Sequence, residues 1–297
     1  MIERLSPMLA AQAEPFDSDD HLFEVKWNGV RTLAAVEGGQ WRAWGRELSD
    51  YAARYPELEL LRGLPDGVVL DGELVVLREG RAELDELMRR HQLVSPRKIQ
   101  EASRFLPATY IVFDLLYAGG RSLLGRPLAE RRRRLEELLA AHNDPRLVFS
   151  AGVAGGGQAF FRQVVEQGHE GAMAKHLKSR YLPGQRGQAW RKIKPFQSIP
   201  CVVLGYTPSR QGFRSLLVGA VWGRKLQYVA ELTSGFTQEA KRRLAPRLPT
   251  LVRSQPAVPC SKRACWVEPE IYCEVRFLER TARGRLRGAH YRGLIEQ

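Results

Sequence analysis

The chain has 297 residues, long enough for two domains that each bury a core, and its 46 Lys and Arg outnumber its 33 Asp and Glu, giving a formal net charge of +13. No apolar run approaches the roughly 20 residues of a membrane helix, and the start has no apolar signal core, which argues against a membrane or secreted protein. The positive charge predicts a polyanionic partner, because Lys and Arg placed on phosphates release counterions. Charge alone does not separate DNA from RNA, tRNA or an anionic membrane surface.

The first strands are predicted around Lys26. Residues 1–20 read as an irregular lead-in, because prolines and an acidic run interrupt them. The next stretch is apolar, passes through Glu24 and Lys26 to Asn28-Gly29, and becomes apolar again, which predicts two strands joined by a turn. Glu24 and Lys26 would share one strand face. Taken alone, a lysine beside a turn glycine is most often a solvated surface residue.

Three further strands and a helix are predicted before residue 120. The strands are at 41–44, 68–77 and 110–117, and the helix is at 83–92. The strand at 68–77 carries Asp71 and Glu73 within an apolar run. Because an unpaired buried carboxylate is costly, each must meet a donor, a cation or solvent.

Two amphipathic helices follow, at 127–141 and 158–167, and Gly168 is the predicted end of the second. Arg131 to Arg134 lie in the first of these helices. Glu136 and Glu137 offer them partners within the helix, so these arginines are predicted to form a solvated face rather than a nucleic-acid surface.

A cluster of charged side chains closes the first domain. Glu170 and Lys175 flank the short stretch 171–174, and Trp190, Lys192 and Lys194 would share one face of a strand at 190–195. Two ammonium groups aimed the same way are costly unless an anion sits between them, so this face predicts an anion site.

The boundary between domains is predicted at 195–200, giving domains at 1–196 and 197–297. The second domain is rich in short strands, at 201–206, 216–222, 226–232 and 271–278, with one helix from 237 to 244 capped by Thr237. This pattern suits a small Greek-key barrel of the OB type. Its cysteines, Cys260, Cys265 and Cys273, together with Cys201, lack zinc-site spacing and are predicted to be reduced structural thiols.

The ordered set of motifs resembles the nucleotidyltransferase motifs of ATP-dependent DNA ligases. The matching segments are Glu-x-Lys-x-x-Gly at 24–29, Asp-Gly-Glu at 71–73, the strand containing Phe113, Glu-Gly-x-x-x-Lys at 170–175 and Lys-x-Lys at 192–194. The nearest pattern is the ligase domain of bacterial end-joining ligases and their stand-alone counterparts. The resemblance implies an α+β fold: a nucleotidyltransferase (adenylation) domain of antiparallel sheets with flanking helices, then a C-terminal OB-fold β-barrel. No additional N-terminal DNA-binding domain of the eukaryotic kind is expected.

The resemblance also implies roles for individual residues. Lys26 would attack the α-phosphate of ATP and become a lysyl-AMP phosphoramidate. Glu24 would accept from the adenine amino group, and Phe113 would stack on the base, although a strand of this kind supplies a core aromatic in any case. Arg31 and Arg46 would hold ribose or phosphate.

The remaining roles concern the phosphates and the metal. Lys192 and Lys194 would flank the α-phosphate, and Glu73 would contact the ribose and, with Glu170, hold Mg²⁺ or Mn²⁺. The substrate implied is nicked double-stranded DNA in repair or end joining, with a Ku-type end-binding protein as a candidate partner. A monomer in the bacterial cytoplasm, associated with the nucleoid, is expected.

Three positions depart from the family pattern. Asn28 replaces an aspartate, and Gly45 replaces a serine before Arg46. Ile295 replaces a final arginine, whose role falls to Arg287 or Arg292 or is absent. The alternatives are an RNA ligase, for which Asn28 has precedent, an mRNA-capping guanylyltransferase, and a nucleic-acid-binding relative that has lost the reaction.

Overall fold

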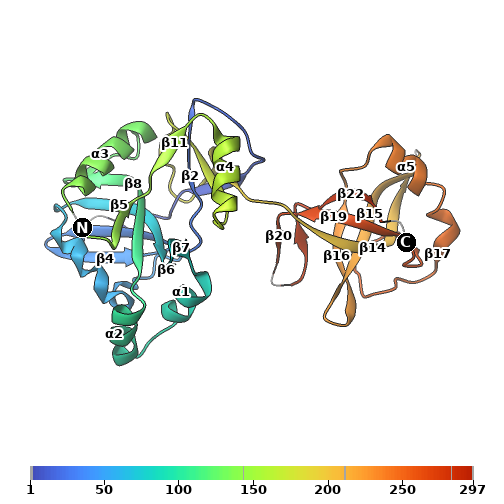
Figure 1. The fold of residues 1–297 in the computed structure, drawn as a ribbon, viewed down its shortest axis with the longest axis horizontal. Coiled ribbons are helices and arrows are strands. Elements are labelled where there is room, and N and C mark those ends of the chain that lie inside the picture. Colours follow the sequence, from blue (N-terminus) through green and yellow to red (C-terminus); the bar gives the residue numbers. More distant parts are fainter. Residues whose placement is uncertain (1–2, 143, 211, 282, 296–297) are drawn as a thin grey trace. The chain divides into compact units, whose positions relative to one another are not determined.

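The structure, a computed structural model, describes residues 3–142, 144–210, 212–281 and 283–295. The chain forms two compact units, one ending at Lys194 and the other beginning at Pro195 (Figure 1). The sequence-based boundary after residue 196 lies two residues further along the chain. Each unit has its own cluster of buried apolar side chains, so each is described by itself.

The first unit contains two sheets. The first sheet has the strand order β1 (Leu9–Gln12), β13 (Arg186–Ile193), β12 (Ala172–His176), β2 (His21–Val25) and β11 (Gly152–Ala154). The prediction that residues 1–20 are irregular is wrong for β1, which pairs in parallel with β13. No local pattern marks this strand, because its partner lies more than 170 residues away.

The second sheet has the order β10 (Leu147–Phe149), β8 (Thr109–Ala118), β5 (Val68–Val75), β3 (Val30–Glu37) and β4 (Gln40–Trp44), and β9 (Arg121–Ser122) pairs with β8. β2 and β3 are the two strands predicted on either side of Asn28-Gly29, but they belong to different sheets and do not form a hairpin. The pairing is mainly antiparallel, whereas β8–β10 and β1–β13 are parallel, so the sheets are mixed. A core cluster containing Leu33, Phe113 and Trp190 unites side chains of both sheets.

Helices cover the sheets of the first unit. They are α1 (Leu84–His91), α2 (Pro96–Phe105), α3 (Leu128–Ala140) and α4 (Gly157–Glu166), with 3-10 turns at Ala52–Arg54 and Pro56–Gly63, and a small hairpin of β6 (Leu77–Arg78) and β7 (Arg81–Ala82). The predicted helices α1, α3 and α4 are confirmed, and Gly168 follows α4 with a φ of +84°. α2 was not predicted from the sequence. α3 packs against β8, which brings its arginines to the edge of the site described below.

The second unit is built on one large sheet. The strand order is β16 (Lys225–Leu232), β15 (Gly212–Trp222), β14 (Gln197–Ser209), β18 (Cys265–Val267) and β17 (Val252–Arg253), and β19 (Tyr272–Phe277) pairs with β14 and with β22 (His290–Leu294). A hairpin of β20 (Glu279–Arg280) and β21 (Leu286–Arg287), the helix α5 (Gln238–Leu244) and a 3-10 turn at Pro249–Leu251 complete it. The predicted cap is confirmed, since the Thr237 side chain accepts from the Ala240 N–H.

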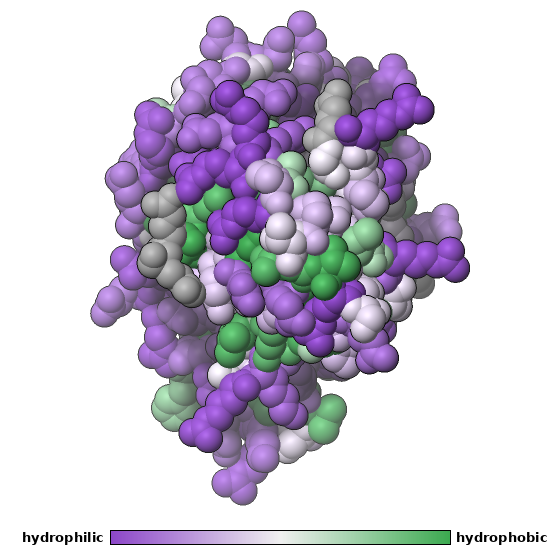
Figure 2. Space-filling view, turned by 90° about the vertical axis from the view of Figure 1, so that its right-hand side faces the viewer, coloured by the Kyte–Doolittle hydropathy of each residue, from purple (hydrophilic) through white to green (hydrophobic). Residues whose placement is uncertain are grey.

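The hydrophilic surface and the free cysteine thiols are consistent with the amino-acid composition. Figure 2 shows a mainly hydrophilic face with apolar residues gathered near its centre. Cys201 and Cys273 are buried, Cys260 and Cys265 are partly buried, and all four thiols are free. In the described ranges no cluster of three or more metal-ligating side chains occurs, and no helix there is long and apolar enough to cross a bilayer.

Candidate active site

Lys26 lies directly after β2, where the chain passes from the first sheet to the second. Its backbone N–H donates to the carbonyl oxygen of Gly171 at 2.9 Å, which fixes the lysine beside the start of β12. Three residues later, a Cβ on Gly29 would lie 2.1 Å from the carbonyl oxygen of Leu74. The chain therefore needs glycine here to pass close to β5.

Two lysines share one carboxylate in this region. Lys26 Nζ donates to Glu170 Oε2, and Lys194 Nζ lies 2.5 Å from Glu170 Oε1. All three side chains retain about a fifth of their exposure, so the group is open to solvent on one side. The sequence predicted an anion between Lys192 and Lys194, which stays a prediction; the carboxylate found here, Glu170, instead lies between Lys26 and Lys194. Lys192 lies on β13 opposite Met173 of β12 and is half-buried.

Glu73 lies on β5, opposite Arg31 on β3. Burial raises the pKa of Glu73 to about 7, although Arg31 and Lys26 pull it down. The charges of Glu170 and Lys26 act on the pKa of Glu73 in opposite directions, Glu170 raising it and Lys26 lowering it. Carboxylate oxygens are the ligands that Mg²⁺ prefers, and Mg²⁺ in nucleotide sites is typically held by one or two carboxylates plus phosphates and water. These two residues therefore fit the predicted metal site.

Arg31 is fixed by Asp71. Its Nε and Nη2 donate to the two oxygens of Asp71, both at 2.6 Å, and Asp71 also accepts from the hydroxyl of Tyr181 at 2.6 Å. Burial opposes the charged form of Arg31, but Asp71 outweighs it and raises the pKa of Arg31 above its usual value. Asp71 is thus the structural acceptor that its place in an apolar strand required.

Two cationic side chains lie over the ring of Phe113. The guanidinium carbon of Arg31 lies 4.5 Å from the ring centroid and Lys175 Nζ lies 3.8 Å from it. The residue is only 7% exposed. Burial also lowers the pKa of Lys175 to about 8, with Glu24 opposing that shift. Stacking of Phe113 on adenine stays a prediction.

Glu24 belongs to a buried ion network. It is 1% exposed, its Oε1 accepts from Arg132, and its Oε2 lies 2.6 Å from Lys175 Nζ. Its predicted contact with the adenine amino group stays a prediction. Arg46 lies on the exposed turn after β4, and no ion pair or hydrogen bond joins it to another described residue.

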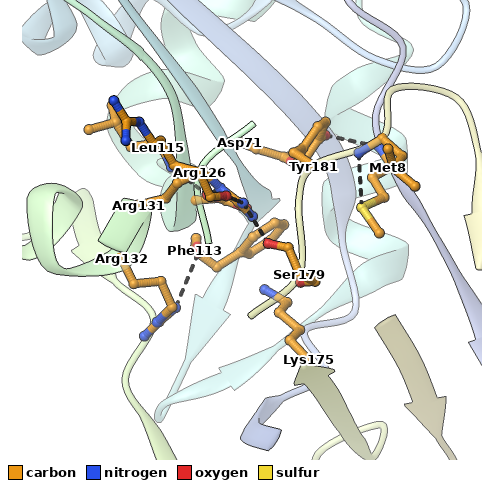
Figure 3. A network of polar contacts seen from close by, with 12 residues as sticks. Met8, Asp71, Phe113, Leu115, Arg126, Arg131, Arg132, Lys175, Ser179 and Tyr181 are labelled. Carbon is orange, nitrogen blue, oxygen red and sulfur yellow. Dashed lines mark hydrogen bonds and ion pairs between the residues drawn. The ribbon is translucent and has the colours of Figure 1, made fainter. Parts of the chain in front are cut away.

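The prediction that Arg131 to Arg134 form a solvated face is wrong for half of them. Arg131 is fully buried and donates to both oxygens of Asp114, at 2.8 and 2.7 Å, and to the carbonyl oxygen of Ser179 at 2.9 Å. Figure 3 shows Arg131 and Arg132 reaching from α3 toward Ser179 and Phe113. Arg133 and Arg134 do pair within the helix, with Glu137 and Glu130. The missed signal was Asp114, a carboxylate in the most apolar strand of the chain, which demanded a buried cation.

Comparison with known proteins shows the family to which a chain with this arrangement of residues belongs. The family model described as the ATP dependent DNA ligase domain matches residues 7–194. That for the ATP dependent DNA ligase C terminal region matches residues 209–296. The chain belongs to the ATP-dependent DNA ligase family. The resemblance read from the motifs and the expected fold class are thereby confirmed.

Individual relatives agree with this assignment. The multifunctional non-homologous end joining protein LigD of Pseudomonas aeruginosa is 34% identical over the whole of this chain, and a DNA ligase of Methanoculleus marisnigri is 32% identical over 91% of it. The solved ligase domain of M. tuberculosis LigD is 31% identical, with a TM-score of 0.58 over 98% of this chain and 95% of that one. The chain spans 36% and 49% of the two full-length relatives.

Proposed function

We propose that the chain seals 5′-phosphate/3′-OH nicks in double-stranded DNA at the expense of ATP, through a lysyl-AMP intermediate. The observation that carries the proposal is the placement of Lys26 beside Glu170 and Lys194, at the junction of two sheets whose motifs match the ligase family. A solved relative, described as mycobacterial DNA ligase D complexed with ATP and MES, is 31% identical to this chain. That likeness supports ATP as the nucleotide.

Lys26, Glu170 and Lys194 would each have a defined part in the first step, the formation of lysyl-AMP. A lysine attacks phosphorus only after its ammonium loses a proton, and the Glu170 carboxylate already accepts the hydrogen bond of Lys26. The Nζ–P bond then forms, the bond from the α-phosphorus to pyrophosphate breaks, and Lys194 offsets negative charge on the phosphates. A Mg²⁺ or Mn²⁺ ion held by Glu73 and Glu170 would add Lewis-acid stabilisation of the same oxygens.

Two transfers on the nucleic acid would follow. AMP passes from Lys26 to the 5′-phosphate of the nick, and the 3′-OH then attacks that phosphate and expels AMP. The names of the LigD relatives support a place in end joining, for which a Ku-type end-binding protein is the candidate partner. A monomer acting at the bacterial nucleoid in the cytoplasm completes the proposal.

An RNA ligase is the second candidate, favoured by Asn28 in place of the usual aspartate. The deciding experiment incubates the protein with labelled ATP or GTP and then with a nicked DNA duplex or an RNA–DNA duplex. We expect labelling by ATP and sealing of the DNA nick. Labelling by GTP, or sealing of RNA strands alone, would replace the proposal by one of its alternatives.

A further inference from the structure

Arg132 is a buried arginine outside the nucleotidyltransferase motifs. It lies on α3 beside the exposed Arg133, yet it is only 7% exposed. Its Nη1 donates to Glu24 Oε1 and to the carbonyl oxygen of Phe113 at 3.1 Å, and its Nη2 donates to the carbonyl oxygen of Ser150 at 2.6 Å. Figure 3 shows the side chain directed from α3 to Phe113.

These three acceptors belong to different layers of the first unit. Glu24 lies on β2 of the first sheet and Phe113 on β8 of the second. Ser150 lies where the chain crosses from β10 of the second sheet to β11 of the first, and its own N–H donates to Val112 of β8 at 2.8 Å. One planar guanidinium therefore ties both sheets and their crossover together, in a geometry that its rigid fork fixes.

The bridge is close to the reacting groups. Lys26 follows Glu24 by two residues along the chain, whereas β8 pairs with β5, which carries Glu73. The relative position of the two sheets thus sets the distance between Lys26, the nucleophile, and the active-site residues of the second sheet, such as Glu73. A misplacement of about 1 Å in an active site can cost roughly 100-fold in rate.

We propose that Arg132 is a positioning residue for the first chemical step, holding the strand that leads to Lys26 against the wall formed by β8 and β5. The inference rests on the proposed function, because it assumes that Lys26 is the nucleophile. Lysine at this position keeps the charge but not the two-armed fork, so it would not hold all three acceptors in one plane. We expect Arg132→Lys to fold and to lose rate selectively in lysyl-AMP formation.

The test separates positioning from general stabilisation. Single-turnover lysyl-AMP formation at saturating ATP is measured for Arg132→Lys beside sealing of a pre-adenylated nick, a step in which Lys26 is not the nucleophile. We expect a fall of about 10- to 100-fold in the first rate and less than about threefold in the second. Equal losses in both steps, or an unchanged first step, would overturn the proposal.

Two neighbours on α3 serve as controls. Arg131→Lys disturbs another buried arginine, whose partners include no residue of β2, so it should lower the unfolding temperature without the step-selective loss. Arg133→Gln changes an exposed residue and should alter neither rate. If Arg132→Lys proves too unstable to assay, Arg132→Gln removes the same fork while its planar amide keeps one donor group for a carbonyl acceptor. It should show the same selective loss, and loss in both steps equally would again refute the proposal.

If the unaltered protein forms no lysyl-AMP, the proposed function fails and not merely the role of Arg132. The two failures are therefore distinguishable in the same set of measurements.

Discussion

Replacement of Gly29 by alanine tests whether the chain after Lys26 must pass as close to β5 as the structure shows. A Cβ at this position would lie 2.1 Å from the carbonyl oxygen of Leu74 and 2.9 Å from Cγ of Glu73. The backbones would have to separate by roughly 1.4 Å to restore ordinary contact near 3.5 Å. The next residue, Val30, pairs directly with Leu74, so the separation would also disturb the first pair of the β3–β5 ladder.

The expected cost follows from this collision. Overpacking in a close-packed interior typically costs about 1–3 kcal/mol, and more where backbone rather than a flexible side chain must move. For a unit of this size each kcal/mol lowers the unfolding temperature by about 2–4 °C, so Gly29→Ala should lower it by about 2 to 12 °C. The displacement of Glu73 should also slow lysyl-AMP formation.

The assay follows the thermal unfolding transition of the first unit. It also measures the rate of lysyl-AMP formation from labelled ATP in a single turnover. Gly187→Ala is the matched control, because this glycine lies on β13 of the same unit and a Cβ there would meet no atom within 4 Å. The reasoning is refuted if the Gly29→Ala protein unfolds at the same temperature as the Gly187→Ala control and forms lysyl-AMP at the same rate.

Three further predictions concern charge. Asn28→Asp places a carboxylate two residues from Lys26, which favours the protonated amine, so the pH–rate profile of lysyl-AMP formation should move to higher pH; coincident profiles would show that residue 28 has no such influence. Burial raises the pKa of Glu73 to about 7, above the usual 4.5 of a glutamate, so the carboxyl binds its proton more tightly when folded, and the free energy of unfolding should decline as pH rises from about 4.5 to 7. Glu73→Gln should remove that part of the decline in urea titrations, and identical pH dependence of the two proteins would contradict the assignment. Binding to a nicked duplex should weaken steeply with salt and vary little with sequence, and an affinity insensitive to salt would count against phosphate contacts.

Part of the site was predictable from local signals, and part only from the resemblance to the ligase motifs. Glu73 and Asp71 stand out as carboxylates in an apolar strand, and Lys194 shares a predicted strand face with Lys192, whereas Lys26 and Glu170 were singled out by the motifs they belong to. The structure brings Lys26, Glu170 and Lys194 together and places Glu73 near them. In the second unit, β14, β15, β16, β19 and α5 also followed from local periodicity and from the Thr237 cap, whereas the shorter strands β17, β18, β20, β21 and β22 were not predicted.

What the sequence analysis missed depends on distant contacts. Arg131 and Arg132 lie next to residues that offer helical charge partners. Asp114 signals that its strand needs a cation, but nothing local reveals that Arg131 supplies it or that Glu24 pairs with Arg132. Glu24 is 108 residues from Arg132. The pairing of β1 with β13 and the passage of residues 26–29 between two sheets are likewise set by tertiary packing, which overrides the hairpin that Asn28-Gly29 suggests.

The most direct test of the central claim is to map the nucleotide adduct on the protein. After incubation with ATP and Mg²⁺ or Mn²⁺, mass spectrometry of proteolytic fragments should locate one acid-labile AMP on Lys26, and Lys26→Arg should abolish it. Labelling on another residue, or a protein that stays unlabelled with both metals, would contradict the account.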